Sequence, residues 1–296
     1  MLEAVRRFEQ EMEEARGMVE EYLAGLFQES VPDNALHEAM RYSVLAGGKR
    51  LRPILTLKFA EACGGRMEDV LRPACAIELL HTYSLIHDDL PCMDNDTLRR
   101  GKPTSHVMFG EWMATLAGDA LQAAAFELVM TSGLPAETVV KMGAVLAQAA
   151  GRQGMCLGQA MDMKSEGQRL TIDELAAIHQ YKTAALLIAA AKFGVLAAGG
   201  GDVQLKNAER YAYHLGMAYQ IIDDVLDATA TTQELGKTAG KDEKSEKTTF
   251  VTLMTERDAR HVAGDQTKYA VAALRGSFKK TGFLETLAVY LEERKY

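Results

Sequence analysis

Two clusters of aspartates are the residues of this sequence best suited to do chemistry. The first cluster is HDDLPCMDND at residues 87–96, and the second is QIIDDVLD at residues 220–227. Carboxylates this close together repel one another unless a cation neutralises them. Mg²⁺ prefers hard oxygen ligands, usually one or two carboxylates together with water and substrate phosphates. Two facing clusters could therefore hold a diphosphate through Mg²⁺.

The spacing within each cluster predicts how its carboxylates meet. In the first cluster, Pro91 predicts that a helix ends near Asp88, and Asp94 returns from the following loop. In the second cluster, helical periodicity predicts one shared face for Gln220, Asp223, Asp224 and Asp227. One Asp–Asp pair alone is more often a solvated helix end. Two such patterns in one helical chain favour a metal–diphosphate site.

Cations stand at glycine turns near the aspartates. GGKRLRP occupies residues 47–53, and LRRGKPT follows the first acidic cluster at residues 98–104. Arginine binds phosphate through its planar fork and lysine acts as a point charge. Each basic group alone is typical of a solvated turn. In a chain of net charge −8, however, cations grouped beside aspartates indicate an anionic substrate.

The elements that must position these residues are predicted to be helices. Apolar residues recur at steps of three and four from Val5 to Leu26, and strand-like alternation is nearly absent. Glycine and proline breaks divide the chain into ten or more helical segments, one of them opened by a capping box at Thr171 and Glu174. Without an interdomain linker or a repeat, residues 1–296 are predicted to form a single all-α domain.

Composition excludes several classes of protein. Hydrophobic residues make up 48% and charged residues 25%, which excludes general disorder. The negative charge argues against a nucleic-acid partner. No apolar run reaches the length of about 18 residues expected of a membrane span, and we expect no signal peptide. Four scattered cysteines without a CxxC pair predict reduced thiols and a cytoplasmic location.

These motifs resemble those of the trans-prenyl diphosphate synthase family. Residues 87–104, HDDLPCMDNDTLRRGKPT, look like its first aspartate-rich motif, and residues 220–227 look like its second. Further matches are the GGKRLRP segment, Lys182-Thr183, Gly236-Lys237 and the KTTF segment at residues 247–250. The resemblance covers residues 37–253 in the family's order. The two-residue insertion in the first motif is similar to bacterial-type farnesyl diphosphate synthases.

The resemblance implies a fold, an activity and partners. The fold would be an isoprenoid-synthase-like bundle of ten or more helices around a central cavity. The activity would be Mg²⁺-dependent, head-to-tail condensation of isopentenyl diphosphate with dimethylallyl or geranyl diphosphate. The product would be farnesyl diphosphate (C15), with geranylgeranyl diphosphate (C20) as the alternative. A homodimer is also implied.

The resemblance further implies the roles of individual residues. Two Mg²⁺ ions would bind Asp88 and Asp94 and a third would bind Asp223, with Asp89 and Asp227 as weaker or supporting ligands. The diphosphate of isopentenyl diphosphate would bind Lys49, Arg52, His81 and Arg100. The allylic diphosphate would bind Arg99, Lys182, Lys237 and Lys247. Lys241 and Lys244 leave open which lysine of the late loop makes that contact. Thr183 and Gln220 would face the developing carbocation.

The chemistry needs no protein nucleophile, because the allylic C–O bond ionises and the released diphosphate can take the proton. Water must be kept out, and we expect the lysine-rich loop to close over the site. Ser84 and Tyr83 lie four and five residues before Asp88, so they should sit about 6 to 7.5 Å deeper along a helix. In the resembling family an aromatic residue at the place of Tyr83 accompanies a C15 product. An ordinary core tyrosine is the alternative explanation.

Three other functions remain open on the sequence. A terpene cyclase shares the helical fold but would carry a different second metal motif. A ferritin-like di-iron bundle needs two Glu-x-x-His motifs, and Glu78 to His81 provides one. A non-enzymatic helical subunit would tolerate loss of both aspartate clusters.

Overall fold

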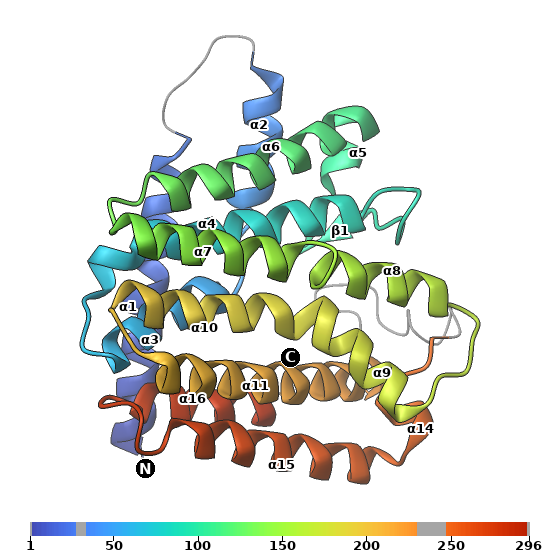
Figure 1. Ribbon diagram of the computed structural model, residues 1–296. Coiled ribbons are helices and arrows are strands. Elements are labelled where there is room, and N and C mark those ends of the chain that lie inside the picture. Colours follow the sequence, from blue (N-terminus) through green and yellow to red (C-terminus); the bar gives the residue numbers. More distant parts are fainter. Residues whose placement is uncertain (1, 28–33, 230–246, 295–296) are drawn as a thin grey trace.

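Helices form almost all of the described chain. The computed structural model describes residues 2–27, 34–229 and 247–294 (Figure 1). The elements are α1 (Leu2–Gly25), α2 (Ala35–Val44), α3 (Leu51–Ala62), α4 (Met67–Asp88), β1 (Leu98–Arg99), β2 (Lys102–Pro103), α5 (Ser105–Phe109), α6 (Glu111–Met130), α7 (Ala136–Ala150), α8 (Met155–Ser165), α9 (Ile172–His179), the π-helix η1 (Gln180–Ala184), α10 (Ala185–Ala197), α11 (Asp202–Thr229), α14 (Phe250–Leu253), α15 (Glu256–Leu274) and α16 (Gly282–Glu293). The predicted all-α class with ten or more helices is confirmed.

Local sequence signals set the helix boundaries. Helix α3 ends at Ala62, and the chain then turns at Gly64, whose positive φ of 93° favours glycine. The capping box predicted for α9 is present. The Thr171 backbone N–H donates to Glu174 Oε2 at 2.9 Å, and the Glu174 N–H donates to Thr171 Oγ1 at 3.3 Å. These bonds satisfy donors that the first turn leaves unpaired.

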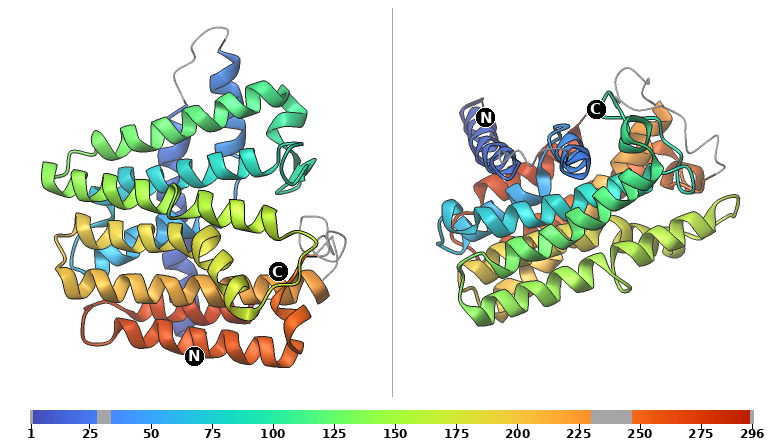
Figure 2. Two further views of the ribbon diagram at one scale, coloured as in Figure 1. Left: turned by 45° about the vertical axis from the view of Figure 1, so that its right-hand side comes forward. Right: turned by 90° about the horizontal axis from the view of Figure 1, so that it is seen from above.

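The long helices pack side by side with their axes roughly aligned. Helices α1 and α2 run across one face of this layer (Figure 2). Neighbouring pairs include α6 with α4, α4 with α3, α3 with α10, α10 with α11 and α11 with α15. Helices α4 and α11 point the same way, so their C-terminal ends lie at the same end of the bundle (Figure 1). This arrangement brings both aspartate clusters to that end.

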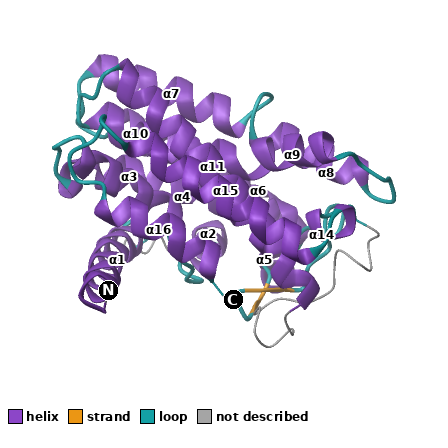
Figure 3. Cartoon of the chain, turned by 90° about the horizontal axis from the view of Figure 1, so that it is seen from below, coloured by secondary structure: helices purple, strands orange, loops and turns teal. Residues whose placement is uncertain are grey.

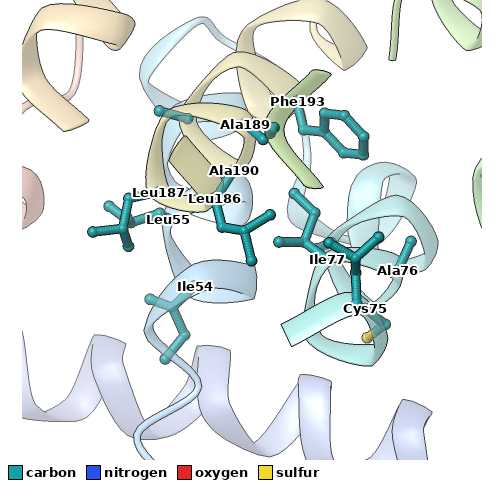
Figure 4. Close-up of a cluster of buried hydrophobic side chains, with 14 of the residues drawn as sticks. Ile54, Leu55, Cys75, Ala76, Ile77, Leu186, Leu187, Ala189, Ala190 and Phe193 are labelled. Carbon is teal, nitrogen blue, oxygen red and sulfur yellow. The ribbon is translucent and has the colours of Figure 1, made fainter. Parts of the chain in front are cut away.

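The core between α3, α4 and α10 is closely packed (Figure 4). Ile54 and Leu55, Ile77, and Leu186 are fully buried there. Burying one such side chain stabilises the fold by about 1.5–3 kcal/mol. At Gly194 of α10 a Cβ would lie 2.3 Å from the carbonyl oxygen of Thr56, so glycine permits the close approach of α3 and α10. This core fixes the helices that carry the site.

Among the described residues, the β-strands β1 and β2 form a short antiparallel hairpin (Figure 3). Leu98 pairs with Pro103 and Arg99 with Lys102. The hairpin follows the end of α4, so it returns the chain past the first aspartate cluster. No helix in the described ranges combines the length and the apolar character needed to cross a membrane.

Candidate active site

The first aspartate cluster forms a turn at the end of α4. Asp88 is the last residue of the helix, and the Asp94 backbone N–H donates to the Asp88 carbonyl at 2.9 Å. The predicted helix end and the return of Asp94 are therefore confirmed. Asp88 accepts a hydrogen bond from Gln159 of α8. Burial raises the pKa of Asp88, and nearby Asp94 adds to this while Lys182 and Arg99 oppose it.

The carboxylates at this turn fit a divalent cation. The Oδ1 atom of Asp94 is buried and has no hydrogen-bond partner, which is costly for an ionised oxygen unless a cation binds it. Within the described ranges no three His, Cys, Asp or Glu residues form a ready-made metal cage. An ion here would take its other ligands from water and phosphate oxygens, as Mg²⁺ commonly does.

Asp89 has a different environment from that of Asp88. Its carboxylate is buried and bonded to Arg99, with Nε at 2.8 and 2.9 Å from its two oxygens and Nη2 at 2.7 Å from Oδ1. Arg99 Nη2 lies 3.9 Å from Asp88 Oδ2. Asp89 thus holds the guanidinium of Arg99 beside Asp88.

The aspartates of the second cluster lie on two different faces of α11. Asp223 is partly exposed and pairs with Arg294, whereas Asp224 is buried and its Oδ2 accepts from the Phe250 backbone N–H at 2.9 Å. Asp227 is half-buried one turn after Asp223. The prediction that Asp224 shares the face of Asp223 is wrong, because consecutive residues point about 100° apart around a helix. Asp224 instead anchors the start of α14.

Lys182 and Thr183 lie in the π-helix η1 between α9 and α10. The Thr183 hydroxyl donates to Gln220 Oε1 at 2.9 Å, so these two predicted residues meet. Gly158 of α8 packs against this turn, since a Cβ there would lie 2.1 Å from the Lys182 nitrogen. Short π-helices are common at functional sites. Here it brings Lys182 and Thr183 toward both aspartate clusters.

Asp162 of α8 is a site residue that the sequence analysis missed. Lys182 Nζ donates to its Oδ2 at 2.7 Å and Lys247 Nζ at 3.2 Å. Burial alone would lower the pKa of Lys182. The negative charges of Asp88 and Asp162 outweigh this effect and raise that pKa. The sequence signal that could have identified Asp162 is its spacing from Gln159. The two polar residues are three positions apart, so they share one face of a helix whose sequence is otherwise largely apolar.

The GGKRLRP segment does not present all its cations together. Arg50 is fully buried and pairs with Glu20 and Glu78, each at 2.8 Å, so it anchors the segment to α1 and α4. Lys49 lies on the exposed side of the segment. The Nε atom of Arg52 is buried without a hydrogen-bond partner, and burial lowers the pKa of this guanidinium.

Arg52, Arg100 and His81 form a cluster of basic side chains. Burial lowers the pKa of His81 well below its usual range, and Arg52 and Arg100 lower it further. Arg100 donates to the Gly47 carbonyl, and a Cβ on Gly48 would lie 2.7 Å from the Arg100 Cζ. Gly48 therefore permits Arg100 to approach. Such a concentration of positive charge suits an anion.

The two predicted chain-length residues lie on α4 below Asp88. Tyr83 is buried, its Oη is 3.6 Å from Cys156 Sγ of α8, and its ring meets His87 edge-on at 5.6 Å. The Ser84 hydroxyl donates to the His81 carbonyl at 2.8 Å. Tyr83 thus fills space between α4 and α8. Lys237 and the loop lysines Lys241 and Lys244 lie outside the described residues.

Comparisons with known proteins identify the family of this chain. The family model described as Polyprenyl synthetase matches residues 33–282. A chloroplastic geranylgeranyl pyrophosphate synthase of Capsicum annuum is 45% identical over 265 residues, covering 88% of this chain and 72% of the relative. An FPP/GFPP synthase from Zymomonas mobilis has a TM-score of 0.86 at 33% identity, covering 98% of this chain and 99% of that chain.

A geranyltransferase from Helicobacter pylori, solved with magnesium and isoprenyl diphosphate, has a TM-score of 0.80 at 31% identity and covers 97% of this chain and 96% of that chain. Curated relatives named as geranylgeranyl pyrophosphate synthases support the C20 alternative better than the expected C15 product. The matches favour chain elongation over a terpene cyclase or a di-iron bundle. The fold is that of the isoprenoid synthases, and this chain belongs to the polyprenyl synthetase family.

Proposed function

We propose that this prenyltransferase joins isopentenyl diphosphate head to tail to dimethylallyl or geranyl diphosphate, with Mg²⁺ held by Asp88, Asp94 and Asp223. The observation that carries the proposal is the buried, unpartnered oxygen of Asp94 near the carboxylate of Asp88, which is 15% exposed. The charge of Asp94 also raises the pKa of Lys182, so carboxylate and ammonium groups share one site. This combination suits a metal-bound diphosphate.

Magnesium bound here would neutralise charge on diphosphate oxygens and stabilise the leaving group. Three ions are proposed, with Asp89 and Asp227 in supporting places. The H. pylori structure, which contains magnesium and isoprenyl diphosphate, supports the choice of metal.

The basic residues provide two diphosphate sites. The allylic diphosphate is assigned to Arg99, Lys182, Lys247 and the undescribed Lys237. The diphosphate of isopentenyl diphosphate is assigned to Lys49, Arg52, His81 and Arg100. Asp162 holds Lys182 and Lys247 in place before the substrate arrives. The oxygen of a phosphate can then replace that of Asp162 as their partner.

Thr183 and Gln220 orient the reacting end of the allylic substrate. Their hydrogen bond fixes the Gln220 side chain, whose oxygen can face the developing carbocation. Buried apolar side chains on α4 and α10 exclude water, which would otherwise capture the cation. The isoprenoid tail would extend along α4 from Asp88 toward Tyr83.

Two product lengths have separate support. The names of the curated relatives favour C20. The buried ring of Tyr83 favours C15, because it fills the space between α4 and α8 about 7.5 Å below Asp88 and would block a longer tail.

A product assay tests the proposed function. Purified protein receives Mg²⁺, labelled isopentenyl diphosphate and either dimethylallyl or geranyl diphosphate, and the dephosphorylated alcohols are sized. We expect chelator-sensitive farnesol or geranylgeraniol from both starters, and the major alcohol decides the product length. An absence of condensation with any divalent metal would refute the proposal.

We also propose a homodimer formed through α5 and α6. Their exposed apolar side chains are Val107, Met108, Trp112 and Leu116, with exposed fractions of 50%, 50%, 67% and 47%. An apolar surface of this kind commonly marks a protein interface. A cytoplasmic location remains a prediction, because several relatives are named as chloroplastic.

A further inference from the structure

Arg294 closes the described chain and reaches into the candidate active site. It is the C-cap of α16, and its side chain is only 4% exposed. Burying an arginine is costly unless its charge is paired and its N–H groups are bonded. The partners of this guanidinium therefore indicate why it is buried.

All these partners belong to α11 or to the last turn of α16. Nη2 of Arg294 donates to the Tyr219 carbonyl at 2.9 Å and to Asp223 Oδ1. Its Cζ lies 3.7 Å from the centre of the Tyr219 ring, a cation–π contact. Nη1 lies 3.4 Å from the Leu291 carbonyl. Stacking and hydrogen bonding together fix the orientation of the guanidinium.

Lys49 belongs to the same charged corner. Although Lys49 is exposed overall, partial burial of its side chain lowers its pKa and Arg294 lowers it further, whereas Asp223 raises it. The corner joins the proposed metal ligand Asp223 to one of the cations assigned to isopentenyl diphosphate.

We propose that Arg294 is a positioning residue that orients the Asp223 carboxylate for magnesium. This inference rests on the proposed metal-binding role of Asp223. A carboxylate held through one oxygen keeps a fixed plane and can still offer its other oxygen to a metal. Groups that orient metal ligands typically contribute about 10- to 100-fold to metal affinity or activity. The end of α16 thereby becomes part of the active site.

Binding of inorganic diphosphate, measured by calorimetry with and without Mg²⁺, tests the inference without relying on turnover. We expect Arg294→Met to weaken the Mg²⁺-dependent binding about 10- to 100-fold, and binding without Mg²⁺ by less than about threefold. Arg294→Lys keeps the charge but loses the planar fork, so it should restore only part of the affinity. Arg275→Met, at the exposed C-cap of α15, is the matched control and should bind as the unmodified chain does.

A double-mutant cycle identifies the route of the effect. If Arg294 acts through Asp223, the Asp223→Asn and Arg294→Met double variant binds no more weakly than Asp223→Asn alone. Additive losses would overturn the inference, as would an Arg294→Met affinity within twofold of the unmodified chain while Asp223→Asn weakens binding. An Asp223→Asn variant with unchanged binding would instead refute the proposed metal role, and the inference with it. Thermal unfolding verifies that each variant is folded, and Arg294→Lys serves for the comparison if Arg294→Met is not.

Discussion

At the scale of single residues, the contacts of each aspartate side chain differ with its neighbours. Asp88 accepts from Gln159 beside the unpartnered oxygen of Asp94, whereas Asp89 is bonded to Arg99. Asp224 anchors a backbone N–H of α14. The aspartate-rich motifs of this chain thus combine carboxylates that we propose to bind metal with carboxylates that hold other groups in place.

Replacing Tyr83 tests the proposed limit on product length. Tyr83→Ala removes the ring that fills the space between α4 and α8, so we expect a product at least one isoprene unit longer than that of the unmodified chain. Tyr83→Phe keeps the ring and is the matched control, with unchanged product length expected. Sizing of the dephosphorylated alcohols provides the measurement. An alanine variant with the original product length would show that the tail ends elsewhere.

His179 makes the stability of the fold depend on pH. It stacks on Phe250 in a buried place, and burial lowers its pKa from 6.5 to about 4. As the pH falls below 6.5 the unfolded chain takes up this proton first, so stability is lost between pH 6.5 and 4. The loss amounts to about 3 kcal/mol.

Urea unfolding across this pH range measures that loss. We expect His179→Gln to flatten the acid side of the profile, because the titrating group is gone. His261→Gln, on the exposed surface of α15, should retain the slope of the unmodified chain. Parallel profiles for all three proteins would mean that other groups govern the acid sensitivity.

At the scale of elements, the sequence predicts where helices end better than it predicts where a π-helix interrupts them. Glycine, proline and capping residues locate the ends of α3, α4 and α9, because those signals act on the local backbone. No local signal in the sequence identifies η1, and its close contact with Gly158 of α8 is a tertiary one. The roles of Arg294 and Asp162 likewise depend on tertiary contacts. Motif residues could therefore be predicted, but most of their partners could not.

The packing of α8 against η1 is tested at Gly158. A Cβ there would lie 2.1 Å from the Lys182 nitrogen, so Gly158→Ala should force the two elements apart and destabilise the fold by about 1–3 kcal/mol. Substrate binding should weaken as well, because Lys182 moves. Chemical denaturation and diphosphate titration provide both values.

Gly143→Ala is the matched control in α7. Apart from the local backbone of α7, no atom lies within 4 Å of its added Cβ, and the gain in helix propensity should stabilise the fold by about 0.5–1 kcal/mol. A Gly158→Ala variant as stable as this control would show that α8 and η1 can separate without cost.

At the scale of the whole molecule, the site and the proposed dimer surface are carried by neighbouring elements. Helix α6 packs on α4, which carries the first aspartate cluster, and its exposed side presents the apolar surface of α5 and α6. A second copy bound there would cover α6 and support α4 from outside. Formation of the proposed dimer would therefore be linked to the geometry around Asp88 through one helix pair.

Breaking the proposed dimer requires a charge on that surface. Leu116→Glu should shift the protein from dimer to monomer, because an unpaired carboxylate would be buried in the interface. Val203→Glu introduces the same charge at an exposed valine of α11 and is the control. Sedimentation velocity over a range of concentrations gives the molecular mass. A Leu116→Glu protein that remains dimeric would place the interface on another face.

Trp112 makes the apolar surface of α5 and α6 observable by fluorescence. It is the single tryptophan of the sequence and is 67% exposed at the start of α6. Its intrinsic fluorescence therefore reports on one place in the molecule, without background from a second indole. Burial by a neighbouring copy would shift the emission to shorter wavelength as the protein is concentrated. The chain thus contains its own spectroscopic reporter of self-association, and no label is needed to follow it.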